Sequence, residues 1–264
     1  MNEHKISFII CCNNEFYMDE CRLYLSELMI PEGMEMDIIE VRNAVSITAG
    51  YNEGMRESDA KYKVYLHQDV FIKNKNFISD IISLFQLDEK IGMIGMSGTP
   101  YLIRTGIIKD GIRLGGFYKL NDYIEKDIIK RTFPIEEGYI EVEAIEGFLI
   151  ATQYDLFWRE DCCETWDFYD VSQSFEFQKA GYKVIIPGQN PEWYFHDCGI
   201  AKALNYGNER KKFLNEYSNY MNNRQKESWE KYKKEVKNRI EFGYKGYEEL
   251  KQKLIDDITK LKEE

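Results

Sequence analysis

The sequence predicts an α/β domain built around a mostly parallel, doubly wound sheet. Apolar runs of strand length alternate with segments whose apolar residues recur at helical spacing, and the joints between them are short. The apolar runs suit strands that are buried on both faces, as in parallel sheets. With 264 residues, 44% of them hydrophobic, the chain is long enough for one sizeable core domain and a smaller appendage.

The first half of the chain supplies a regular alternation. Its expected elements are a strand over 6–12, a helix over 16–28, a strand over 36–41, a helix over 46–58 and a strand over 64–72. Asn13-Asn14-Glu15 stops the first strand, and Pro31 with Gly33 ends the first helix. Either Ser46 or Thr48 can cap the second helix.

The second half continues the alternation with one interruption. Its expected elements are a helix capped by Asn76, a strand over 91–96, a strand over 139–144 continued by the apolar run 145–150, a helix over 172–180 ended by Gly181, and a strand over 183–186. Segment 97–140 has no long helix and carries a Lys109-Asp110-Gly111 turn, which predicts a hairpin excursion from the sheet. Beyond residue 200, the pattern becomes helical and rich in Lys and Glu. We therefore expect a core domain over 1–205 and a C-terminal helical extension over 206–264.

Polar residues interrupt the apolar stretch from Val64 to Ile72. His67, Gln68 and Asp69 would lie at the carboxyl end of this strand, where open α/β sheets bind ligands. Burying such groups between Leu66 and Val70 is costly unless something binds or pairs with them. The stretch therefore predicts a binding site.

Two further polar clusters occur inside aromatic runs. His196 follows Trp193-Tyr194-Phe195, and a carboxylate plus an imidazole can hold Mn²⁺ or Mg²⁺; a hydrogen-bonded structural histidine is the alternative. A closed zinc site is disfavoured, because no Cys or His spacing supports one. Asp170 lies beside Trp166 and could act either as a helix cap or as a general base.

Charge and cysteine usage exclude several classes of protein. The net charge of −11 argues against a nucleic-acid surface, which needs clustered Lys and Arg. The six cysteines form no C-x-x-C pair, which indicates reduced thiols, and the N-terminal apolar run is too short for a signal peptide or a membrane span. We therefore expect a cytoplasmic protein. The C-terminal helices either pack on the domain or make a peripheral membrane or protein contact.

Several ordered motifs add up to a family resemblance. The chain resembles glycosyltransferase family 2, with the GT-A nucleotide-diphospho-sugar transferase fold, and in particular the branch in which the usual Asp-x-Asp is written His-Gln-Asp. The similarity covers about residues 5–200. It rests on the opening strand Ile6–Glu15, the helix motif Ala49–Gly54, Leu66-His67-Gln68-Asp69, Glu146-Gly147, Tyr169-Asp170 eleven residues ahead of Gly181-Tyr182, and His196.

The resemblance implies a role for each matching residue. It implies Asp170 as catalytic base, and Asp69 with His196 as ligands of a divalent cation, Mn²⁺ or Mg²⁺. The implied nucleotide-sugar-binding residues are Cys12, Asn13, Glu15, Asn43, Asn52, His67 and Gln68, and the implied acceptor-side residues are Glu146 and Gly147. Trp166 is added to the acceptor side because its indole offers a face on which an apolar sugar surface could rest.

Three positions depart from the family pattern. His67 replaces the first Asp of the metal motif, Tyr169 replaces the Glu of the Glu-Asp pair, and Arg42-Asn43 replaces the acidic residue often found after the second strand.

The implied activity is that of an inverting, metal-dependent glycosyltransferase. It would move a sugar from a nucleoside-diphosphate sugar to a glycan or small-molecule acceptor, in glycan or secondary-metabolite assembly. The alternative is a non-catalytic nucleotide-sugar or glycan-binding module on the same fold. A nucleotidyltransferase is a weaker third option, because Cys12-Asn13-Asn14-Glu15 is not a glycine-rich, basic phosphate loop.

Overall fold

A computed structural model describes residues 1–115, 118–119, 138–189, 191–197, 205–223, 248–249 and 252. The chain forms two compact units, Met1–Asn219 and Tyr220–Glu264. Most of the predicted C-terminal extension and part of segment 97–140 lie outside the described residues. Among the helices that are described, none is long and apolar enough to cross a membrane.

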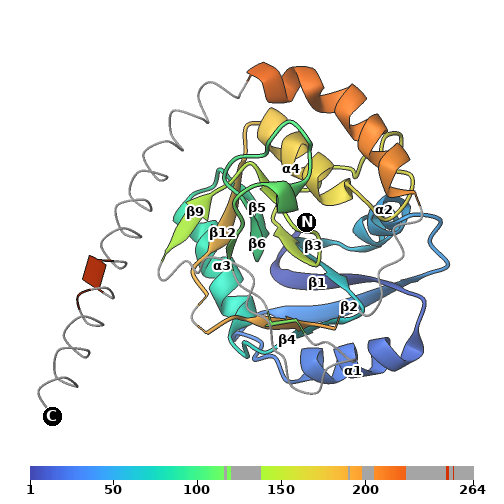
Figure 1. Ribbon diagram of the computed structural model, residues 1–264. Helices are drawn as coiled ribbons and strands as arrows, with labels where there is room; N and C mark the ends of the chain where they lie inside the picture. The colour runs from blue at the N-terminus through green and yellow to red at the C-terminus, as the bar shows by residue number, and fades with distance from the viewer. Residues whose placement is uncertain are drawn as a thin grey trace, which may run out of the picture. The chain divides into compact units, whose positions relative to one another are not determined.

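The first unit is organised around a seven-stranded sheet in the order β2-β1-β3-β11-β5-β12-β9 (Figure 1). Its strands are β1 (Asn2–Cys12), β2 (Glu35–Arg42), β3 (Ala60–His67), β5 (Ile91–Gly95), β9 (Tyr139–Glu141), β11 (Leu149–Thr152) and β12 (Lys183–Pro187). β1 runs parallel to both β2 and β3, and β5 runs parallel to β12. β11 and β9 run in the opposite direction to their neighbours. The predicted α/β class with a mostly parallel sheet is confirmed.

Helices cover both faces of this sheet. They are α1 (Glu15–Ser26), α2 (Ile47–Glu57), α3 (Phe77–Leu87) and α4 (Tyr169–Lys179). Figure 1 shows α1 and α3 on one side of the strands and α2 and α4 on the other. Residues 206–219 of a further helical stretch pack on α4, where Phe213 stacks on Phe168 and Phe175.

The alternation of side chains along β1 explains why the sheet is covered twice. Ile6, Phe8 and Ile10 belong to the core formed with α1 and α3, whereas Ile9 faces α2. Gly54 of α2 lies so close to Ile9 that an added Cβ would come within 2.4 Å of the Ile9 Cγ2 atom. A glycine at this position therefore lets the helix pack directly on the strand.

Local capping sets the helix starts. The Asn14 side chain accepts a hydrogen bond from Phe16 N at the start of α1, and Ser46 caps α2 by accepting from Ala49 N. Asn76 holds the N-cap position of α3 without a side-chain cap bond. Gly181 follows α4 with φ +90°, the left-handed conformation that suits glycine at a helix end.

Two small sheets lie beside the central one. One contains β6 (Ser97–Thr99), β7 (Leu114–Gly115) and β10 (Ala144–Ile145), and the other contains β4 (Val70–Ile72), β8 (Tyr118–Lys119) and β13 (Tyr194–His196). β6 and β7 pair in antiparallel fashion, and the segment between them includes the 3₁₀ turn Ile108–Asp110. Residues 116–117 and 120–137 of the expected excursion are outside the described part of the chain.

The structure differs from three sequence-based expectations. The apolar run 64–72 is two strands in two sheets, because the chain turns at Gln68 and Asp69 and β4 pairs with β13 instead. The run 139–150 is likewise divided among three short strands in two sheets. Helix α4 begins at Tyr169, three residues earlier than expected, so Asp170 lies in its first turn and Phe168 takes the N-cap position.

Candidate metal and catalytic site

The pairing of β4 with β13 brings together two residues that are far apart in the sequence. His196 lies opposite Val70 in this antiparallel ladder, and Asp197 N donates a hydrogen bond of 2.9 Å to the Asp69 carbonyl oxygen. Asp69 therefore stands beside His196, next to the point where β3 ends. His67 is the last residue of β3, so it reaches the same place from the central sheet.

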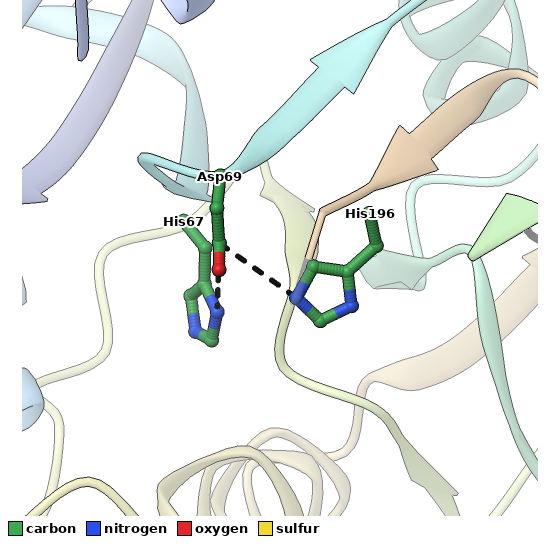
Figure 2. A group of neighbouring side chains, drawn as sticks. All are labelled: His67, Asp69 and His196. Carbon is green, nitrogen blue, oxygen red and sulfur yellow. Dashed lines mark ion pairs between the residues drawn. The ribbon is translucent and has the colours of Figure 1, made fainter. Parts of the chain in front are cut away.

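The Asp69 carboxylate faces two imidazole rings, those of His67 and His196 (Figure 2). Its Oδ1 atom is 3.9 Å from His67 Nδ1 and 3.7 Å from His196 Nε2. One ligand atom from each of the three residues lies within 4.8 Å of the other two. Atoms that share a first-row divalent ion with bonds of about 2.0–2.2 Å lie roughly 3 to 4.4 Å apart, so small side-chain rotations would let one ion bridge the three residues.

Electrostatics also fit a cation at this cluster. Burial raises the pKa of Asp69 to about 6 and lowers the pKa of His67 to about 4. Metal ligation needs a neutral imidazole, and low solvation favours that form of His67. Among the described residues, no Lys or Arg forms an ion pair with Asp69, so this carboxylate has no cationic side chain to offset its charge.

Phe148 lies beside both histidine rings, whose centroids are 6.1 Å apart. Its ring centroid is 4.5 Å from that of His196 and 6.3 Å from that of His67. In addition, His67 N donates to the Phe148 carbonyl oxygen, at 3.0 Å. Phe148 therefore forms part of the wall of the cluster, although the sequence alone does not single it out from other apolar residues of its run.

Asp170 joins this region through the residue before it. The Tyr169 hydroxyl oxygen is 2.6 Å from His67 Nε2, and burial holds the pKa of Tyr169 well above its ordinary value, which keeps the phenol protonated. Burial raises the pKa of Asp170 to about 7, and the negative charge of Glu146 acts in the same direction. Backbone N–H groups of Val171 and Gly147 hydrogen-bond to the Asp170 carboxyl and oppose this shift. The carboxyl can therefore accept a proton near neutral pH.

The predicted acceptor-side residues have different environments. Glu146 is buried and accepts hydrogen bonds from Arg113 and, at 2.5 Å, from Ser97 Oγ. Gly147 packs against Tyr169, whose hydroxyl oxygen would lie 2.0 Å from a Cβ added at this glycine. Trp166 is 47% exposed, so its indole is open to solvent.

Gln68 ties the end of β3 to the loop after β1. Its Oε1 accepts from the backbone N–H groups of Asn13 and Asn14, each at 3.0 Å, and its Nε2 donates to Asn13 Oδ1 at 2.6 Å. The predicted nucleotide-sugar residues Asn13 and Gln68 are thus brought together at the carboxyl edge of the sheet.

Glu15 and Cys12 lie in the same loop region but are engaged by neighbours. Glu15 forms ion pairs with Arg42 and Arg22, and the Arg42 hydrogen bond lowers its pKa. Cys12 is buried, and its Sγ lies 3.9 Å from Glu15 Oε1. Asn43 follows β2 with φ +58°, a left-handed conformation that asparagine tolerates better than most residues.

Asn52 has a structural environment inside α2. It is buried, its Nδ2 donates to the Trp158 carbonyl oxygen and to Glu160 Oε1, and its Oδ1 accepts from Trp158 N. The side-chain amide therefore holds the loop around Trp158.

Tyr169 is absent from the predicted site residues, although its hydroxyl contacts His67. Its departure from the Glu-Asp pattern is the sequence signal that could have identified it.

The chain is an α/β protein with helices on both faces of a mostly parallel sheet. A carboxylate and imidazole cluster at the end of a central strand is its candidate metal site. The chain belongs to the glycosyltransferase like family, whose model matches residues 7–217. This range includes every site residue described above. No curated protein matches the chain.

Solved glycosyltransferase structures resemble this chain at low identity. Residues 1–349 of S. aureus TarS in complex with UDP match at 12% identity with a TM-score of 0.48, over 80% of this chain and 66% of that one. The mannosyltransferase PcManGT from Pyrobaculum calidifontis in complex with GDP-Man and Mn²⁺ matches at 11% identity with a TM-score of 0.48, over 78% and 60%. TarS 1–349 in complex with UDP-GlcNAc matches at 11% identity with a TM-score of 0.44, over 75% and 59%. The matched region spans less than two thirds of each of these chains.

Proposed function

We propose that this protein is an inverting, metal-dependent glycosyltransferase that moves a sugar from a nucleoside-diphosphate sugar to an acceptor hydroxyl, in glycan or secondary-metabolite assembly. The observation that carries the proposal is that a candidate cation site and a candidate catalytic carboxyl are connected in a chain of the glycosyltransferase like family. His67, Asp69 and His196 form a cluster suited to a cation, and Tyr169 links that cluster to Asp170, a carboxyl with a pKa of about 7.

Asp69 and His196 would hold the cation. A divalent ion bound there supplies positive charge that offsets the charge developing on a departing diphosphate. Asn13 and Gln68, together with the other donor-side residues named from the family resemblance except Asn52, would contact the nucleotide-sugar at the same edge of the sheet. The Gln68 hydrogen bonds to the loop after β1 support this, because they fix that loop beside the cluster.

Asp170 would act as the general base. A carboxyl whose pKa lies near neutral pH can take the proton of an acceptor hydroxyl as the new bond forms, an effect worth about 10²- to 10⁴-fold in rate. Attack from the face opposite the departing diphosphate would invert the anomeric carbon in a single displacement. Glu146, Gly147 and Trp166 would shape the acceptor side, with the exposed indole of Trp166 offering an apolar surface to a sugar ring.

Two substitutions separate donor binding from catalysis. Asp170→Asn should reduce sugar transfer by about 10²- to 10⁴-fold while leaving the affinity for a nucleoside diphosphate with Mn²⁺ unchanged. Asp69→Ala should lose the Mn²⁺-dependent part of that affinity as well as the activity. Isothermal titration with a panel of nucleoside diphosphates, together with a donor hydrolysis and transfer assay, measures both.

The results of these assays distinguish the candidate functions. Turnover that persists in Asp170→Asn removes this residue from the role of base. Nucleotide binding by the wild-type protein without turnover of any donor would instead indicate the non-catalytic binding module. If Mn²⁺ adds nothing to binding by the wild-type protein, the proposed metal dependence is wrong.

A further inference from the structure

The two residues that depart most clearly from the family's charged motifs contact each other. His67 stands in place of the first Asp of the metal motif, and Tyr169 stands in place of the Glu beside the catalytic Asp. In the structure their side chains share a hydrogen bond, with 2.6 Å between His67 Nε2 and Tyr169 Oη. This contact joins the end of β3 to the first turn of α4.

The hydrogen bond fixes which ring nitrogen of His67 faces the cluster. Tyr169 engages Nε2, and Nδ1 points toward Asp69, 3.9 Å from its Oδ1 (Figure 2). A neutral imidazole carries a proton on one nitrogen and a lone pair on the other. If Nε2–H donates to Tyr169, the lone pair of Nδ1 is directed into the cluster.

We infer that Tyr169 is a positioning residue that makes His67 the third ligand of the cation, so that the site has the donor set of two imidazoles and one carboxylate. This inference rests on the proposed metal-dependent function, and it gives His67 a role different from the nucleotide-sugar contact that the family resemblance implies. Metal-bound histidines commonly donate their second N–H to a fixed acceptor, which here is a phenol oxygen.

The surroundings of Tyr169 hold its hydroxyl in place. The ring is buried, with centroid distances of 5.9 Å to Trp158 and 6.0 Å to Tyr51. Gly147 leaves room for the hydroxyl, which any side chain at that position would displace. The acceptor of the His67 N–H is therefore set by packing rather than by a flexible side chain.

The donor set also predicts the kind of ion. Imidazole nitrogen is a common ligand of first-row transition ions, whereas Mg²⁺ prefers oxygen ligands and water; Mn²⁺ also favours oxygen, but it is the softer of the two candidate ions. Two imidazoles with a single carboxylate should therefore bind Mn²⁺ more tightly than Mg²⁺.

Mn²⁺ affinity of the full-length protein, measured by electron paramagnetic resonance of free Mn²⁺, tests the inference. Tyr169→Phe keeps the ring and removes the hydroxyl, and it should weaken Mn²⁺ binding by about 10- to 100-fold. Tyr51→Phe is the matched control: it removes another buried hydroxyl from the same aromatic cluster, and among the described residues that hydroxyl has no hydrogen-bond partner. It should bind Mn²⁺ as the wild-type protein does.

A double substitution shows whether Tyr169 acts through His67. If it does, His67→Ala and His67→Ala/Tyr169→Phe should bind Mn²⁺ equally weakly. Additive losses, or wild-type affinity in Tyr169→Phe, would overturn the inference while leaving the proposed transferase intact. If the wild-type protein itself binds no Mn²⁺, both proposals fail on their metal component.

Nitrogen-15 spectra of the histidine rings give a readout that needs no metal. The sequence has only three histidines, so the ring signals can be assigned. His67 should be the tautomer protonated at Nε2, and Tyr169→Phe should convert it to a mixture of tautomers. A wild-type His67 protonated at Nδ1 would contradict the inference.

Discussion

Burial gives Asp170 a pKa of about 7, well above the ordinary aspartate value, because the charged form loses hydration. The neighbouring charge of Glu146 contributes to this shift, whereas the N–H groups of Val171 and Gly147 counteract it. A general base must be deprotonated at the working pH, so its pKa must not be too high. It must also bind the transferred proton well, so its pKa must not be too low. A carboxyl with a pKa near neutral pH meets both conditions.

The proposed transfer activity should follow the ionisation of Asp170, the proposed base. We expect kcat/KM of the transfer reaction to rise tenfold per pH unit below about pH 7 and to level off above it, because only the charged carboxylate acts as base. Glu146→Gln removes one negative charge near Asp170, so it should shift this limb to lower pH. A pH profile of initial rates, recorded with saturating Mn²⁺, measures the position of the limb.

Two other outcomes of the pH profile would contradict this account of the Asp170 environment. A limb near pH 4 in the wild-type protein would mean that Asp170 titrates like an exposed carboxyl. A limb that stays in place in Glu146→Gln would mean that the Glu146 charge does not reach the base.

At the scale of elements, the strand–helix alternation could be predicted because it depends on the local spacing of apolar residues. β1, α1, β2, α2 and β3 each follow from apolar spacing and from capping residues such as Ser46. The division of run 64–72 could not be predicted, since β4 is defined by its pairing with β13, a strand far away in the chain. A local sequence pattern does not identify a pairing partner that lies so far away in the chain.

The candidate site shows the same limit. Asp69, His196 and Asp170 could be named from motif order, and the structure brings Asp69 and His196 together. The link between His67 and Tyr169 depends on the contact of two distant elements, so no local pattern contains it. Asn52 shows the converse, because a motif residue that the resemblance assigns to the donor site has its hydrogen bonds inside the fold.

Asn52 therefore offers a test at the scale of elements. Asn52→Ala should lower the free energy of unfolding by about 1–3 kcal/mol, because it leaves buried groups of Trp158 without partners. Asn52→Asp should be at least as destabilising, since a carboxylate would then face the Trp158 carbonyl oxygen and Glu160. Urea unfolding followed by tryptophan fluorescence measures both.

A second substitution identifies the source of the loss. Asn52→Asp/Glu160→Gln should recover part of the stability, because it restores a donor opposite the new carboxylate. Affinity for a nucleoside diphosphate should stay unchanged in the Asn52→Ala variant at a temperature where it is folded. A large loss of affinity in that variant would instead support the role in nucleotide-sugar binding that the family resemblance implies for Asn52.

At the scale of the whole molecule, the site weakens the fold that carries it. The folded-state pKa values of Asp69 and Asp170, about 6 and about 7, lie above the ordinary aspartate value, so the folded protein binds protons more tightly than the unfolded chain does. This contribution to stability is therefore present below about pH 4 and is lost as the pH rises toward 7. A net charge of −11 adds repulsion in the same direction.

A bound cation should reverse part of this loss, since it binds the charged form of Asp69 in the folded protein. At pH 7.5, Mn²⁺ at 100 times its dissociation constant should stabilise the protein by about 2.7 kcal/mol and raise Tm by roughly 5–10 °C. Asp69→Ala should abolish the shift, and EDTA should reverse it in the wild-type protein. His4→Ala removes an exposed histidine at the start of β1 and should keep the full shift, which distinguishes the site from casual binding to surface imidazoles. An equal shift in wild type and Asp69→Ala, measured by differential scanning fluorimetry, would place the ion elsewhere on the molecule and remove the cluster at the end of β3 from the proposed mechanism.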